Sequence, residues 1–77
     1  IGDINNLLFI DKNLLKETIE KIELYFFDEG TSPSASHKTD LIMYCYKEVY
    51  QAKSNTGEYK ALLNKNVISL FEKQIKH

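Results

Sequence analysis

Apolar residues in the first third of the chain recur at the spacing of a helix. Their separations of four, three and four positions place them on one side of an α-helix. They are Leu15, Ile19, Ile22 and Phe26. Asp11 stands where a carboxylate can accept hydrogen bonds from the first-turn amides, and Gly30 tolerates the left-handed backbone that commonly ends a helix. The pattern predicts a helix from Asp11 to about residue 29.

A second helix is predicted from about Ser36 to Ser54, and its most apolar part is LIMYCYKEVY at 41–50. At 100° per residue its apolar side chains cover an arc of roughly 200°, whereas an ordinary surface helix has a stripe of just over 100°. They are Leu41, Ile42, Met43, Cys45, Tyr46, Val49, Tyr50 and Ala52. Such an arc favours the central helix of a bundle. The alternative is that the Met43/Tyr50 edge faces a partner.

Tyr44 falls outside this arc, on the polar side of the same helix. Its polar neighbours on the helical wheel are Asp40, Lys47, Glu48 and Gln51. No core requires a tyrosine at that position, and tyrosine is enriched at protein interfaces because it combines a rigid ring with a polar tip. Tyr44, Met43 and Tyr50 are therefore the candidate partner-binding residues.

A third helix is expected to begin at Asn55, with Glu58 three positions on as in a capping box, and to run almost to residue 77. Its expected apolar side comprises Tyr59, Leu63, Val67, Leu70 and Phe71. The polar run NKN at 64–66 is a point where this helix could bend or split. The small, polar and proline-bearing segment 30–37 is expected to form the loop between the first two helices.

These elements predict an all-α fold, a small three-helix bundle formed by a single domain of residues 1–77. The segment 1–10 is ambiguous, because Asp3 could cap a short fourth helix and an extended strap is nearly as well supported. The expected core residues are Leu15, Ile19, Ile22, Phe26, Ile42, Cys45, Val49, Leu63, Val67 and Leu70.

Charge and size narrow the range of partners. All ten basic residues are lysines, and with eleven acidic residues they leave a net charge of −1. Arginine supplies the bidentate grip on phosphate, so a domain without it is poorly suited to hold nucleic acid. No apolar run approaches the ~20 residues that span a bilayer, and no membrane association is expected. The expected location is cytoplasmic or otherwise intracellular.

Side chains able to perform catalysis or bind metals are few and scattered. Cys45 lies in the middle of the apolar arc, and neither His37 nor His77 is at helical spacing from it, which favours a buried structural thiol over a nucleophile. His37 and Asp40 are one turn apart and form only a weak pair of metal ligands; His37 is more typical of a solvated residue at a helix start. We therefore expect no catalytic residue, no cofactor and no metal site.

Two parts of the chain resemble known helical families. YKEVYQAKS at 46–54, followed by EYKALL at 58–63, resembles the second and third helices of a cullin N-terminal repeat, in which a Y-x-x-V-Y run precedes a helix rich in leucine and tyrosine. DLIMYCYKEVY at 40–50 with GEYKALL at 57–63 equally resembles the small helical-bundle immunity proteins of bacteriocin producers. Both resemblances imply helical proteins that act by contact, and neither assigns functional residues here.

The sequence favours a non-catalytic protein-interaction module that acts through a helix face, as a scaffold, adaptor, inhibitor or immunity-type binder. The partner is expected to be another protein or a second copy of the chain, because so short a chain can need a partner to cover a wide apolar arc. The alternative is a small DNA-binding regulator or its dimerisation domain, with Lys53, Lys60 and Lys65 directed toward phosphate.

Overall fold

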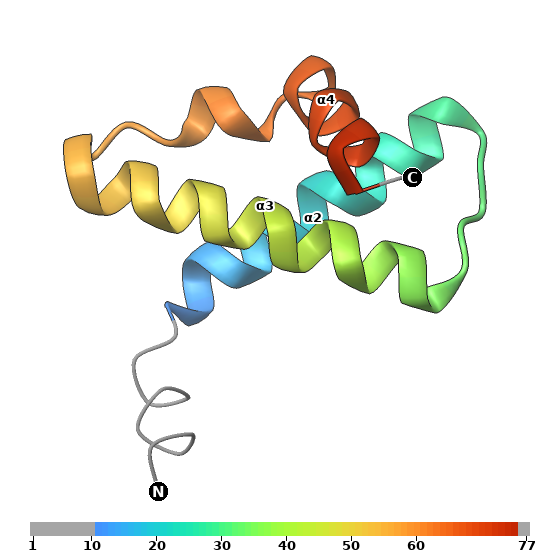
Figure 1. The fold of residues 1–77 in the computed structure, drawn as a ribbon, viewed down its shortest axis with the longest axis horizontal. Coiled ribbons are helices and arrows are strands. Elements are labelled where there is room, and N and C mark those ends of the chain that lie inside the picture. The colour runs from blue at the N-terminus through green and yellow to red at the C-terminus, as the bar shows by residue number, and fades with distance from the viewer. Residues whose placement is uncertain (1–10, 76–77) are drawn as a thin grey trace, which may run out of the picture.

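The computed structural model describes residues 11–75, which fold into three α-helices and one 3₁₀-helix without a strand (Figure 1). The elements are α2 (Lys12–Glu29), α3 (Ala35–Thr56), η1 (Lys60–Leu63) and α4 (Lys65–Ile75). Figure 1 shows η1 running back along α3 after the turn that follows it, with α4 placed over the middle of the bundle. The expected all-α bundle of three helices is confirmed, and the ambiguous segment 1–10 lies outside the described residues.

Both ends of α2 are set by the residues that the sequence indicated. The Asp11 carboxylate accepts a 3.0 Å hydrogen bond from the backbone N–H of Leu14, which satisfies one of the amides left free in the first turn. Gly30 adopts a left-handed backbone with φ of 70°. The N–H of Thr31 then donates to the carbonyl of Phe26 at 3.2 Å, which closes the helix end in a Schellman pattern.

α3 is longer than expected, and the predicted cap at Asn55 is wrong. The helix continues through Thr56 and ends at Gly57, whose φ is 79°. The Thr56 hydroxyl accepts a 3.1 Å hydrogen bond from the N–H of Glu58, so this side chain, and not Asn55, holds the turn. At the other end Ser34 caps the helix by accepting from the N–H of His37 at 3.1 Å.

The expected third helix is split in two at Asn64, inside the NKN run. Asn64 ends η1 with an extended backbone and caps α4, because its side-chain oxygen accepts from the N–H of Val67 at 3.0 Å. The break resets the helical phase. Ile68 therefore enters the core, whereas Val67 is half-buried and Leu70 is 58% exposed. The expectation that Leu70 belongs to the core is wrong for this reason.

The core has two parts, one under α4 and one under η1. The first part comprises Ile22, Tyr25, Phe26, Leu41, Cys45 and Ile68. The second comprises Leu14, Val49 and Leu63. α3 contributes to both parts and packs against α2, η1 and α4.

Burial on α2 is displaced from the expected stripe toward the side that meets η1 and α4. Leu15 and Ile19 are half-buried, while Leu14 and Thr18 are buried instead. A buried threonine is tolerated because its hydroxyl donates to the carbonyl of Leu14 at 2.8 Å. The displacement follows from packing on two sides, since α2 must cover both α3 and the η1–α4 segment.

Two leucine substitutions test this core directly. Leu41→Ala should lower the free energy of unfolding by about 2–5 kcal/mol, because Leu41 is fully buried and its removal leaves a cavity. Leu70→Ala, the matched change at an exposed site, should alter it by no more than about 0.5 kcal/mol. Urea unfolding followed by circular dichroism measures both; equal losses would mean that the phase of α4 is misassigned.

Candidate functional site

The segment 41–50 divides into three sides around α3, and the first side meets α2. The Tyr46 hydroxyl accepts a 3.0 Å hydrogen bond from the backbone N–H of Asp11, the residue just before α2. Tyr46 is half-buried, and it packs against the part of the core that contains Val49. The tyrosine thus holds the start of α2 against the C-terminal half of α3.

The second side of α3 meets α4 and includes Tyr44. The Tyr44 and Phe71 rings lie with their centroids 5.3 Å apart at 53°, a separation at which aromatic pairs attract. Tyr44 is half-buried in this contact, so the expectation that no packing needs it is corrected. The helical wheel predicts the polar side for Tyr44 because spacing within one helix does not show that α4 brings an aromatic ring there.

The third side of α3 faces outward and carries Met43 and Tyr50. Met43 is 64% exposed and Tyr50 is 41% exposed. They are seven positions apart and therefore share one side of the helix, while Tyr44 lies on a different flank. The Tyr50 ring is 5.8 Å from the Tyr46 ring. The structure thus groups two of the three candidate residues, and the partner-binding role of all three remains a prediction.

Cys45 lies between these sides at the centre of the bundle. It is fully buried, as expected for a structural thiol. Burial, with a smaller contribution from the charge of Glu48, raises the pKa of the Cys45 thiol to about 12. A thiol in this state is protonated at neutral pH and is a poor nucleophile.

Two ion pairs join α2 to α3, one near each end of their contact. Lys53 Nζ donates to Asp11 Oδ2 at 2.7 Å, and Lys38 Nζ lies 3.1 Å from Glu23 Oε1. The contact with Lys53, followed by the backbone bond from Leu14, holds the pKa of Asp11 below its ordinary value, and the same contact raises the pKa of Lys53. The pairs link the start of α2 to the end of α3 and the end of α2 to the start of α3, as in two antiparallel helices.

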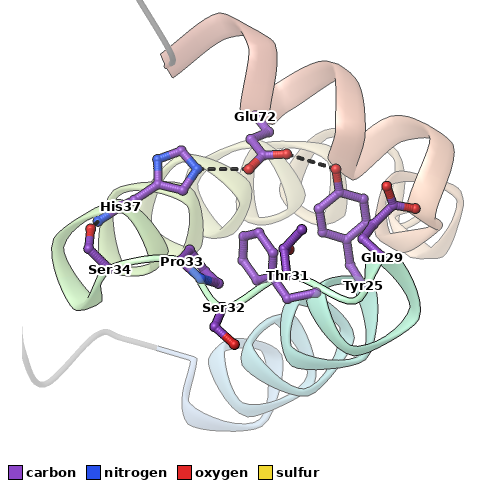
Figure 2. Close-up of a pocket in the computed structure, with 9 residues that line it drawn as sticks. Tyr25, Glu29, Thr31, Ser32, Pro33, Ser34, His37 and Glu72 are labelled. Atoms are coloured by element: carbon purple, nitrogen blue, oxygen red, sulfur yellow. Dashed lines mark hydrogen bonds and ion pairs between the residues drawn. The ribbon is translucent and has the colours of Figure 1, made fainter.

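A second group of polar side chains ties all three α-helices together where α2 ends and α3 begins (Figure 2). Glu72 of α4 accepts a 2.7 Å hydrogen bond from the Tyr25 hydroxyl of α2, and its other oxygen lies 2.8 Å from His37 Nε2 of α3. An ionised carboxylate only accepts, so this contact is a hydrogen bond in the tautomer whose Nε2 carries the proton. Burial, then the bond to Glu72, raise the pKa of Tyr25. His37 is half-buried here and not the solvated residue expected.

Beside this network lies a hollow of about 470 Å³, between the end of α2, the loop 31–34 and α4. Its wall includes the hydroxyl side chains of Thr31, Ser32 and Ser34 together with the two carboxylates of Glu29 and Glu72. Figure 2 shows Tyr25, Glu72 and His37 converging at its edge. The contacts at this edge join side chains of α2, α3 and α4, so they tie the three helices together.

η1 is fastened to α2 by a similar polar contact. The Tyr59 hydroxyl donates to Glu17 Oε1 at 2.9 Å, and this bond, followed by burial, raises the pKa of Tyr59. The carboxylates of α2 alternate with lysines along the sequence, a spacing typical of a solvated face. Glu17 and Glu23 instead bond to other elements, which spacing within one helix could not reveal.

Within residues 11–75 no three His, Cys, Asp or Glu side chains are grouped to hold a metal ion. No helix in that range is long and apolar enough to cross a membrane.

The chain was compared with protein-family models, curated proteins and solved structures. No family model, no curated protein and no solved structure matches it.

The three-helix tie predicts a stability loss when Glu72 loses its charge. Glu72→Gln should lower the free energy of unfolding by about 1–3 kcal/mol, because the Tyr25 hydroxyl and the His37 ring lose a charged acceptor. Glu58→Gln, the same change at an exposed site, should change it by no more than about 0.5 kcal/mol. Denaturant unfolding at pH 7 measures both variants; an unchanged stability of Glu72→Gln would contradict the structural role.

The Asp11–Lys53 pair predicts a specific pH dependence of stability. The pKa of Asp11 is lowered on folding, so its contribution is complete above the ordinary carboxyl value of 3.8 and is lost as the pH falls below it. The pKa of Lys53 is raised, so its contribution persists below 10.5 and is lost as the pH rises beyond that value. Lys53→Met should make stability depend less on pH in both the acidic and the basic range, while leaving the Asp11 cap intact. Thermal unfolding from pH 2 to 12 measures this. A dependence of the unfolding temperature on pH identical to that of wild type would show that the pair is not formed.

Proposed function

We propose that this chain is a non-catalytic protein-interaction module that binds a partner through the outward side of α3. The observation that carries the proposal is the exposure of Met43 and Tyr50 on one side of a helix whose other two flanks are packed. Grouped exposed apolar side chains mark interaction surfaces. Methionine and tyrosine are also enriched at interfaces.

The chemistry of the remaining polar groups supports a role in binding over a role in catalysis. Cys45 is buried with a raised pKa. His37, Glu72 and Tyr25 are engaged in bonds between helices, an arrangement that stabilises the fold. A module of this kind would act by presenting a rigid helical surface to another protein or to a second copy of the chain.

DNA binding, the alternative class, has less support from the same surface. Lys53, one of the three lysines considered for phosphate contact, bonds to Asp11. The chain also has no arginine, and its net charge is −1. Strong salt-dependent binding to random duplex DNA would reverse this preference.

Charge introduced on the outward side of α3 tests the proposal. The double variant Met43→Glu/Tyr50→Glu should weaken association about tenfold or more, since it removes two contact side chains and places carboxylates in their positions. Leu70→Glu is the matched control, because Leu70 is equally exposed but lies on α4. Both variants should keep the wild-type circular dichroism spectrum.

The readout depends on the partner. If sedimentation shows that the wild-type chain self-associates, the double variant should be monomeric and the control should not. If the wild-type chain is monomeric at millimolar concentration, proteins of the encoding organism that are retained by the immobilised wild-type chain and control, but not by the double variant, would support the proposal. Association that survives in the double variant and is lost in Leu70→Glu would contradict it.

A further inference from the structure

A stripe of α2 residues borders α3 on the outer side of the bundle. Asp11, Leu15, Ile19 and Glu23 follow one another at intervals of four, which places them along one side of the helix. The first and last of them form the two ion pairs with α3. Leu15 and Ile19 lie between these fixed points and are half-buried, so they line the edge of the α2–α3 contact.

The facing stripe of α3 has the same construction. Lys38 and Lys53 are the partners in the two ion pairs, and Ile42 and Tyr46 lie between them on the same side of α3. Both of these side chains are half-buried and pack against the core. We call the strip formed by the half-buried residues of the two stripes the outer seam. Its members are Leu15, Ile19, Ile42 and Tyr46.

The rim of the outer seam is apolar on α3 and basic on α2. Met43 and Tyr50 extend the apolar strip on the α3 side, and Tyr50 lies beside Tyr46. On the α2 side Lys12 follows Asp11, which contacts Tyr46, and Lys16 is one turn further along the same side. Both lysines are exposed, which places their charges beside the tyrosine end of the seam.

Positive charge gathers at this end although the chain as a whole is slightly negative. Lys47 adds a third exposed lysine, one turn from Met43. No ion pair within residues 11–75 involves any of these three lysines. Glu20 is the exposed carboxylate one turn beyond Lys16, and the Asp11 carboxylate at the tyrosine end is paired with Lys53. The net charge of the chain is −1, so the lysines here are a local concentration.

We propose that the outer seam binds an acidic amphipathic helix of another protein; this inference rests on the proposed function and names its partner class. The strip between two antiparallel helices accepts a third helix, whose apolar side chains at intervals of three, four and seven positions would lie on the seam. The three lysines would face carboxylates on the flanks of that helix. The interaction is therefore apolar at its centre and charge-assisted at its edge.

A second copy of the chain fits the seam less well than a foreign helix does. In a symmetric dimer the same patch lies on both subunits. When the two-fold axis runs along the seam, the lysine-rich end meets a lysine-rich end, and juxtaposed like charges oppose association; only an axis across the seam avoids this contact. A nucleic acid would use the lysines but would leave the apolar floor of the seam without a complementary surface. An acidic helix satisfies both features.

A designed peptide pair tests this assignment on the full chain. The probe is a helical peptide of about 18 residues with leucines along one side and glutamates on both flanks, long enough to follow the seam. The matched peptide carries lysine at every glutamate position. Each is titrated into the ¹⁵N-labelled chain at low and at high salt. The acidic peptide should shift the amide signals of the outer seam and bind more weakly at high salt, and the basic peptide should not bind.

Charge-reversal variants then test the contribution of the lysines. Lys12→Glu/Lys16→Glu should weaken binding of the acidic peptide about tenfold, as expected for reversing two partly screened contacts. Lys60→Glu/Lys65→Glu is the matched control on η1 and α4 and should leave binding unchanged. Unfolding midpoints of both variants show whether the fold is retained.

Each other outcome overturns the inference in a distinguishable way. Equal binding of both peptides at the seam, or indifference to reversal of Lys12 and Lys16, would remove the acidic partner but leave the proposed function standing. Shifts confined to α4 or the loop 31–34, unaffected by Met43→Glu/Tyr50→Glu, would remove both. Binding of a random DNA duplex at the seam, tighter than the acidic peptide at low salt, would assign the surface to nucleic acid. Absence of binding by either peptide would also overturn the inference.

Discussion

α3 is removed from water along two flanks at once, one against α2 and one against α4, and every other described element packs on it. This double burial explains why so wide an arc of one helix is apolar or aromatic. Tyr46 serves the α2 flank, Tyr44 serves the α4 flank, and the fully buried Cys45 lies between them. Met43 and Tyr50 remain outward and are not used to pack α3 against α2 or α4. These two exposed side chains are therefore available to a partner in the proposed function.

The polar contacts complete the bundle at positions where the apolar core does not reach. Asp11 and Glu23 tie α2 to α3, Glu17 ties α2 to η1, and Glu72 ties α4 to both other helices. In the described range no buried side-chain nitrogen or oxygen lacks a hydrogen-bond partner. A chain of this size has a small core, so these contacts add links between the helices at its margins.

Local signals allowed much of the fold to be predicted, and failures occur where tertiary contacts decide. Asp11 and Gly30 bound α2 as their chemistry requires, because capping depends on neighbours in the chain. Which side of α4 faces the core could not be derived in the same way. Whether Asn64 bends or breaks a helix depends on how the residues around it pack against the other helices. Leu70 was consequently placed in the core although it is exposed. Partners distant in sequence, such as Glu72 for His37, leave no signal in spacing.

Oxidative footprinting of the native chain tests the threefold division of α3 most directly. Hydroxyl radicals modify methionine, cysteine and tyrosine according to their exposure, and rates in urea supply the reference for each residue. In dilute solution Met43 and Tyr50 should react at close to their unfolded rates, Tyr44 and Tyr46 more slowly, and Cys45 scarcely at all. Rapid modification of Cys45, or protection of Tyr50 equal to that of the buried Tyr25, would show that α3 does not lie in the bundle as described.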